Sequence, residues 1–193
     1  KDIEAEALIG VAQWYSAMGQ QAAAIKYYEM AVEKYKKVDN KLGEISTANS
    51  IASTYLNFSS LQLYKNKYQE LNSMLDTVPV ELKNSREYKT IAGSIAFNQA
   101  QFDLMSKQYD PAISEFKKCI ALFEQSGNIK KIPSAYTSIG LACLLQATGV
   151  HDKDPVKKAE GIRQAIGYFE KALPLAKEFG LLEQQWDCAI GLG

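Results

Sequence analysis

The sequence predicts an all-α protein folded as an α-solenoid, a right-handed superhelix of antiparallel helix pairs. One observation is a pattern of small, aromatic and small residues at fixed spacing, first seen as Ala24, Tyr28 and Ala31, which returns along the chain. Another is that apolar residues recur at the three-and-four spacing of amphipathic helices. A third is that turn residues such as Gly19 separate these stretches, so that successive helices fold back on one another.

The small-aromatic-small pattern identifies the second helix of each pair. Its further copies are Ala112, Phe116 and Cys119, then Ala165, Phe169 and Ala172, and in weaker form Tyr64, Tyr68 and Leu71. Repetition on this scale is typical of an array of helical hairpins, each of which buries part of its surface against its neighbours.

The first hairpin combines a helix over 3–17 with a second helix over 24–35. Ala24 and Ala31 are small enough to let the partner helix approach, and Tyr28 fills the space between them. The first helix is expected to turn an apolar stripe toward this seam, and its members are Ile3, Ala7, Leu8, Val11, Ala12, Trp14 and Tyr15.

These residues resemble the tetratricopeptide repeat. The matching pattern is Val11-Ala12-x-x-Tyr15, then Gly19, Ala24, Tyr28 and Ala31. Leu8 stands in place of the leading Trp of the family and Lys36 in place of its closing Pro. The family repeat is about 34 residues long, whereas 40 residues separate Ala12 from Ala52, which resembles the long-period variant.

The later units follow the same plan. We expect Gly43 to act as a stop before the second unit, Asp110 to cap the second helix of the third unit, and Gly127 to end that helix. Asp154 followed by Pro155 is expected to begin the last long helix. The whole chain, 1–193, is predicted to be one repeat domain within a longer protein, with repeats over about 3–38, 42–76, 86–126 and 133–179 and a partial repeat over 182–193.

Composition excludes several classes of function. Lys plus Arg and Asp plus Glu number 22 each, so no net charge draws the chain to nucleic acid. No apolar run is long enough to cross a membrane. Cys119, Cys143 and Cys188 lie among apolar residues, which predicts buried free thiols and a reducing, cytoplasmic location. A signal or anchor upstream of Lys1 stays open.

Catalytic and cofactor groups are not expected. His151 is the single histidine, and its neighbours Asp152 and Asp154 indicate a solvated loop rather than a metal site. The glycines form no phosphate-binding motif, and no nucleophile stands with a base. We therefore expect no enzyme, no cofactor and no metal, with an enzyme the least favoured of three functions.

The repeat resemblance instead implies protein or peptide binding along a concave groove formed by the first helices, as in the sensing or scaffolding part of a larger signal-transduction regulator. None of the groove positions is basic, which disfavours the carboxylate clamp of chaperone-docking members. Amide side chains there are expected to bind a peptide backbone and apolar ones its side chains. The positions carried over are Ile9, Gln13, Ser16, Asn49, Ser53, Asn57, Phe97, Gln101, Leu104, Met105, Thr137, Leu141 and Leu144.

Two alternatives remain at this point. The same positions can pack against further repeats of the same chain instead of a ligand. The chain can also serve as a structural spacer or an oligomerisation module, with self-association through the apolar end of the last repeat at Leu192.

Overall fold

A computed structural model describes residues 2–193 of the chain. All regular secondary structure in this range is helical, which confirms the all-α prediction. The helices are α1 Ile3–Ala17, α2 Gln21–Lys37, α3 Lys41–Asn57, α4 Leu61–Asp76, α5 Val80–Lys83, α6 Arg86–Met105, α7 Tyr109–Ser126, α8 Ile132–Leu145, α9 Pro155–Glu178 and α10 Leu182–Leu192. A 3₁₀ turn over Ile129–Lys131 precedes α8, and a π turn over Gln146–Val150 follows it.

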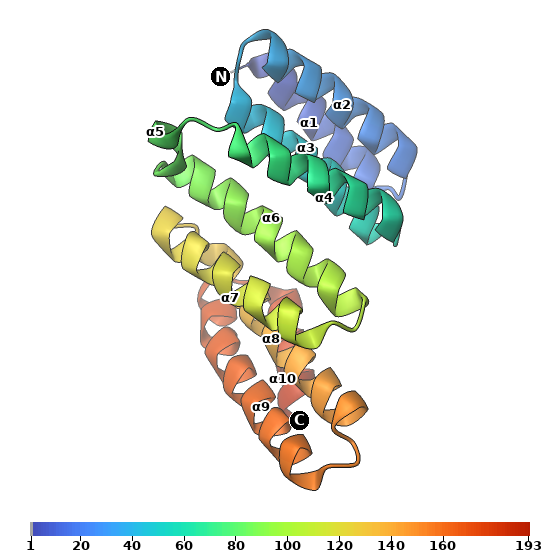
Figure 1. Cartoon of the computed structure of the whole chain (residues 1–193), viewed down its shortest axis with the longest axis vertical. Coiled ribbons are helices and arrows are strands. Elements are labelled where there is room, and N and C mark those ends of the chain that lie inside the picture. Colours follow the sequence, from blue (N-terminus) through green and yellow to red (C-terminus); the bar gives the residue numbers. More distant parts are fainter. Residues whose placement is uncertain (1) are drawn as a thin grey trace. The chain divides into compact units, whose positions relative to one another are not determined.

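The chain divides into two compact units, Lys1–Asn98 and Gln99–Gly193, and the division falls within α6. In the first unit α1 packs against α2, α2 against α3, and α3 against α4. Figure 1 shows α1 and α3 behind α2 and α4. In the second unit α8 packs against both α7 and α9, and α10 packs against α9 and α8. Helices that follow one another in sequence are therefore neighbours in space.

Six helices end in the same way, with one residue in the left-handed conformation. After α1, the N–H of Gly19 donates to Ser16 O at 3.0 Å, and the N–H of Gln20 donates to Tyr15 O at 2.9 Å. These are the two hydrogen bonds of the Schellman motif. The same pair of bonds recurs at every member of the set, whose positive-φ residues are Gly19, Asp39, Ser59, Lys107, Gly127 and Gly180.

These helix ends are regularly spaced along the chain. Gly19, Asp39 and Ser59 lie 20 residues apart, as do Lys107 and Gly127. A 20-residue half-repeat gives the 40-residue period read from the sequence. At each end the turn donates hydrogen bonds to the last carbonyl groups of the helix. The chain can therefore reverse into the next helix within a few residues.

Two predicted helix boundaries are confirmed. Gly127 ends α7 with φ of 75°, a backbone conformation that glycine adopts without a steric penalty. Asp154 is the N-cap of α9, and its carboxylate accepts hydrogen bonds from the N–H groups of Val156 at 3.2 Å and Lys157 at 3.1 Å. Pro155 takes the first helical position, where its missing N–H leaves no bond unmade.

The boundary predicted at Gly43 is wrong, because this glycine lies in the first turn of α3. The stop is at Asp39, which has φ of 52°, and Asn40 is the N-cap, accepting from the N–H of Gly43 at 3.0 Å. A Cβ on Gly43 would lie 2.7 Å from the ring of Tyr35. Gly43 therefore serves the packing of α2 on α3 rather than a turn.

The N-cap predicted at Asp110 is also wrong. Gln108 is the N-cap of α7, and Asp110 and Pro111 lie in its first turn. The chain reverses at Lys107, the left-handed residue after α6, and α7 begins two residues later at Tyr109. Asp110 therefore lies inside the helix and cannot be its N-cap. The carboxylate of Asp110 accepts from Gln146 Nε2 at 2.9 Å instead.

The core of the first unit contains the predicted seam. Ala24, Tyr28 and Ala31 are all buried. Ala12 of α1 and Ile51 of α3 join Ala24 and Tyr28 in one apolar cluster, so α2 is covered on both sides. The assignment of this pattern to the inside of a hairpin is confirmed.

The apolar stripe predicted on α1 is only partly buried. Ala12 is buried and Leu8 and Tyr15 are half-buried, but Trp14 is 57% exposed and Ile3 is 82% exposed. Periodicity locates a helix but does not distinguish its two faces when both carry apolar residues. On α1, the face opposite Ala12 is apolar as well.

The core of the second unit repeats the pattern with phenylalanine in place of tyrosine. Ala112, Phe116 and Cys119 of α7 are 0% exposed. On α9, the ring of Phe169 lies between Gly140 of α8 and Gly191 of α10, and a Cβ on either glycine would collide with it. The three helices therefore meet around one phenyl ring, which requires glycine at both contacts.

Candidate binding surfaces

The predicted groove positions of the first unit lie on α1, α3 and α6. Gln13 and Asn57 are exposed, and Ser16, Ser53 and Phe97 are partly exposed. Ile9 packs against the buried apolar clusters between α1 and α2. The side chains available to a ligand here are thus mainly uncharged and polar.

Asn49 is not an open groove residue. Its side chain is buried, and its Oδ1 accepts a hydrogen bond from Asn98 Nδ2 at 2.9 Å. A buried amide with a partner contributes to the interior of the unit, and its removal would leave Asn98 without this acceptor. A change at Asn49 would therefore report stability as well as binding.

The predicted positions of the second unit are more apolar. Met105 and Leu141 are exposed, and Leu104 and Leu144 are partly exposed. Gln101 Nε2 donates to Ser138 Oγ at 3.3 Å, which holds the end of α6 against α8. An exposed Leu145, one turn after Leu141, extends this apolar surface and was not among the predicted positions.

Thr137 is buried like Asn49. Its hydroxyl donates to Pro133 O at 3.0 Å and lies 3.4 Å from Cys188 Sγ, on α10. A hydroxyl in this place joins α8 to α10 and is not available to a ligand.

An aromatic group at the end of α1 was missed as a surface feature. The rings of Trp14 and Tyr15 meet edge to face with centroids 5.0 Å apart, and Tyr15 stacks on Tyr27 at 5.3 Å. Trp14 is the exposed member. In the sequence, the exposure of Trp14 is indicated only by its position nearly opposite Ala12 around the helix. The apolar character of tryptophan favoured burial instead.

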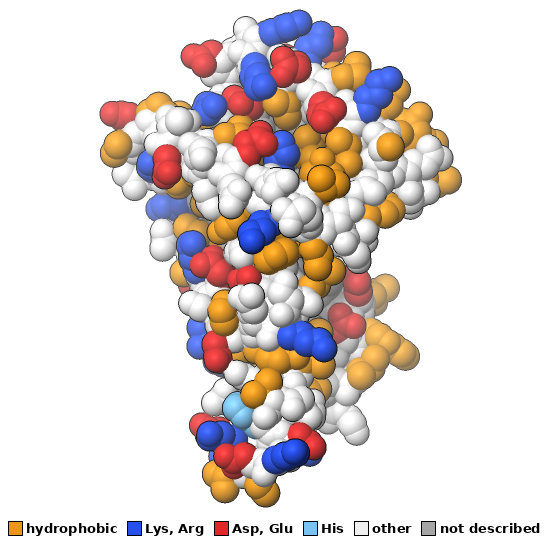
Figure 2. Space-filling view, turned by 45° about the vertical axis from the view of Figure 1, so that its right-hand side comes forward, with side chains coloured by type: hydrophobic (Ala, Val, Ile, Leu, Met, Phe, Trp, Pro, Cys, Tyr) orange, Lys and Arg blue, Asp and Glu red, His pale blue; other side chains and the backbone are white. Residues whose placement is uncertain are grey.

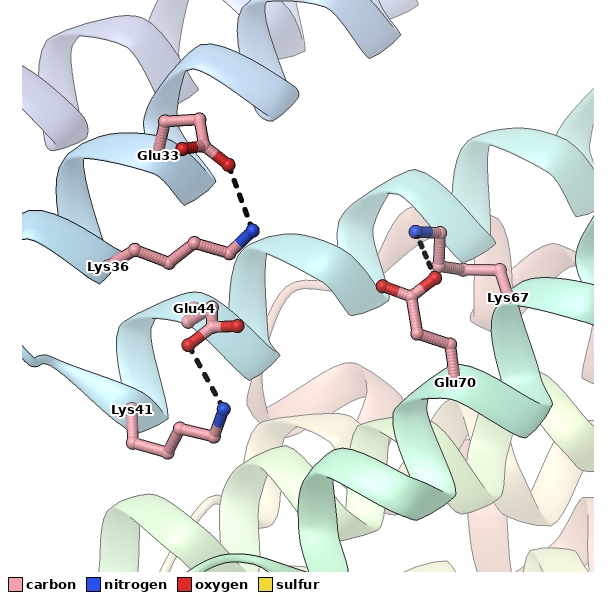
Figure 3. Close-up of polar contacts among 6 residues, drawn as sticks. All are labelled: Glu33, Lys36, Lys41, Glu44, Lys67 and Glu70. Carbon is pink, nitrogen blue, oxygen red and sulfur yellow. Dashed lines mark hydrogen bonds and ion pairs between the residues drawn. The ribbon is translucent and has the colours of Figure 1, made fainter.

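Exposed charges are balanced on the surface. Figure 2 shows basic and acidic side chains interspersed over the face in view. On α2, α3 and α4, lysine and glutamate pair three residues apart, as Figure 3 shows: Lys36 with Glu33 at 2.9 Å, Lys41 with Glu44 at 3.2 Å, and Lys67 with Glu70 at 2.6 Å. Lys36 and Glu33 are both exposed, and such a pair contributes about 0.3–0.5 kcal/mol.

These pairs are close enough to affect one another. The hydrogen bond that Lys36 Nζ donates to Glu33 raises the pKa of Lys36, and the charges of Glu33, Glu44 and Glu70 act in the same direction. Carboxylates on α2, α3 and α4 thus all stabilise the charged form of Lys36. The result is a neutral patch, which does not attract a polyanion.

The thiols have little nucleophilic character at neutral pH. Burial raises the pKa of Cys119 to about 12 and raises that of Cys143. The thiolate is the reactive form of cysteine, so neither group is activated. All three cysteines are free and buried, as predicted.

The loop around His151 uses its carboxylates for structure. Asp152 pairs with Lys158 at 2.6 Å, and Asp154 caps α9, with the backbone hydrogen bond from Lys157 lowering its pKa. Among residues 2–193, no group of three or more His, Cys, Asp or Glu side chains is gathered as a metal would require.

Neither a protein-family model nor a curated protein sequence matches the chain. Within the described range 2–193, no helix combines the length and the apolar character needed to span a bilayer.

Asp103 is the buried carboxylate of the second unit, on α6. Burial raises its pKa, a hydrogen bond from Gln99 Nε2 at 2.9 Å opposes the rise, and the charge of Glu115 adds to it. A carboxyl group whose pKa is higher in the folded state stabilises the fold below its unfolded pKa, near 4, and loses that contribution as pH rises through the folded value.

We therefore expect Asp103→Asn to raise the free energy of unfolding at pH 7, because the amide keeps an acceptor for Gln99 without a buried charge. The gain should disappear near pH 3.5, where Asp103 is protonated in both states. Urea unfolding at the two pH values measures the difference. The exposed Asp187→Asn serves as a control, and a gain for Asp103→Asn that is equal at both pH values would contradict the assignment.

Proposed function

We propose that the chain is a tetratricopeptide-like interaction module whose helical hairpins stack as an α-solenoid. Support comes from the repeated closure of the helices at 20-residue intervals and from the burial of the small-aromatic-small pattern in α2, α7 and α9. In such arrays the first helix of each pair faces the concave side, which binds extended peptides or partner helices.

The observation that carries the proposal is the character of the first-helix side chains that stay accessible. In the first unit Gln13 and Asn57 offer uncharged donors and acceptors, and in the second unit Met105 and Leu141 offer apolar contacts. Amides suit the backbone of an extended peptide, and Met and Leu suit its apolar side chains. We propose that the uncharged positions of the first unit bind the backbone of a peptide and that the apolar positions of the second unit bind apolar side chains, within the sensing or scaffolding region of a larger regulator.

A test starts from peptides selected on the intact chain from a random display library. Gln13→Ala with Asn57→Ala, and separately Met105→Ala with Leu141→Ala, should each weaken calorimetric affinity for a selected peptide by about tenfold or more, at about 1 kcal/mol for each of the two lost contacts. Lys26→Ala with Glu29→Ala, on the exposed face of α2, is the matched control and should have no effect. Unchanged affinity in both groove variants, or an equal loss in the control pair, would contradict the groove assignment.

An oligomerisation module is the second candidate, and one observation favours it. Leu182, Trp186 and Ile190 of α10 lie four residues apart, and each is at least 66% exposed. Such a stripe suits contact with another apolar surface. Failure to select any peptide, together with a molar mass above that of one chain by light scattering, would favour this candidate over peptide binding.

A further inference from the structure

The second unit carries a pocket that the groove proposal does not use, a hollow open to solvent beside α7 and α9. It has a volume of about 390 Å³ and is lined by Lys117 of α7 and by Gln164, Gly167, Tyr168 and Lys171 of α9. This volume lies within the range of small-molecule sites, about 300–1,000 Å³. The pocket lies on the second helices of the pairs, whereas the predicted groove lies on the first helices.

The charge of the lining is positive. Lys117 and Lys171 supply two ammonium groups, and no carboxylate is among the lining residues. Within the part of the chain that the structure describes, neither lysine forms an ion pair. The positions three and four residues away from each lysine on its own helix hold no acidic residue either. This differs from Lys118, which pairs with Glu115 at 3.2 Å.

The remaining lining residues give the pocket a polar donor and an aromatic wall. Lys171 Nζ lies 5.2 Å from the centroid of the Tyr168 ring, so the ammonium group is held beside the phenol. Gln164 Nε2 donates to Glu160 Oε1 at 3.4 Å, in an exposed setting. Glu160 is the one carboxylate that this contact places near the rim.

Gly167 keeps the pocket open. A Cβ on this residue would have no heavy atom within 4 Å, so packing does not require glycine here, unlike Gly140 and Gly191. Glycine inside a helix costs about 0.5–1 kcal/mol relative to alanine. Its effect at this position is to leave the space between Lys117 and Lys171 unfilled.

We propose that this pocket binds the phosphate group of a small phosphate monoester. Two lysines without carboxylate partners match the double negative charge of such a group, for which lysine is a common ligand in proteins. A pocket of this size has room beyond the phosphate for an organic substituent. The site is independent of the groove, and either can fail without the other.

Calorimetry on the intact chain at low ionic strength tests the charge requirement, with phenyl phosphate and inorganic phosphate as probes. Phenyl phosphate should bind more tightly than inorganic phosphate. Lys117→Gln with Lys171→Gln should weaken its binding by about tenfold or more. Lys118→Gln with Lys177→Gln removes the same charge from the same two helices and should leave the affinity within about twofold.

A second variant tests the space rather than the charge. Gly167→Leu keeps both lysines and fills the pocket, so it should also weaken phenyl phosphate binding by about tenfold. Its melting temperature should equal or exceed that of the parent chain, because leucine is the better helix former and meets no neighbour. Gly167→Ala adds only one methyl group, so its affinity for phenyl phosphate should lie between those of the parent chain and of Gly167→Leu.

Four results would overturn the proposal. One is that phenyl phosphate shows no binding at a concentration of about 10 mM. Another is equal weakening by the two double-lysine variants, which would mean a general surface charge effect. A third is unchanged binding in a folded Gly167→Leu chain. The last is equal affinity for phenyl phosphate and inorganic phosphate, which would refute the organic ester as the ligand.

Discussion

Phe169→Ala should lower the free energy of unfolding by about 3–5 kcal/mol, the range for removing a fully packed aromatic side chain. The ring is 3% exposed and fills the contact between Gly140 and Gly191. Neither glycine has a side chain that can move into the space, so the cavity would stay open and α8, α9 and α10 would all lose contacts. Urea unfolding followed by far-ultraviolet circular dichroism measures the loss.

Trp186→Ala is the matched control for this prediction. Trp186 is also a large aromatic residue of the second unit, but it is 70% exposed, so its removal should change stability by about 0.5 kcal/mol or less. If both variants lost the same stability, the phenyl ring of Phe169 would not be the packing centre of the three helices.

Ala24→Leu and Ala165→Leu should each cost about 1–3 kcal/mol by overpacking a helix crossing. Both alanines are at most 1% exposed in the structure, so there is no space for three more carbon atoms. Leucine and alanine have similar helix propensities, which leaves steric strain as the main cause. The same urea titration measures both variants.

Lys26→Ala, on the exposed face of α2, is the control and should have almost no effect. An equal loss of stability in Lys26→Ala and Ala24→Leu would refute the assignment of Ala24 to the buried side of α2 and of Lys26 to the exposed side. Since the two positions lie two residues apart on one helix, a difference between them reports which side is packed.

Much of the fold can be read from the sequence because helix pairing is local. Ala24, Tyr28 and Ala31 mark a face that must be buried, and Gly19 marks a reversal a few residues earlier. Both signals lie within about two helical turns or one loop, where spacing alone fixes geometry. Gly43 was misread because its role depends on Tyr35, a contact between two helices.

The candidate site was less predictable. Gln13 and Asn57 are accessible as expected, but Asn49 and Thr137 are buried with partners at Asn98 and in α10. A side chain on a first helix can face a ligand, its own hairpin or the next helix, and the pattern of residue types is similar in all three cases. The partner is decided by residues far away in the sequence.

The sequence by itself determined the helices, their pairing in chain order and the small-aromatic-small seam, because these depend on periodicity and on turns within a few residues. Only the tertiary structure decided which apolar residues of α1 are exposed, why Gly140 and Gly191 are glycine, and that Lys117 and Lys171 line one pocket. Those facts depend on where separate helices meet, and the distance across a helix contact is set by the side chains of both partners together.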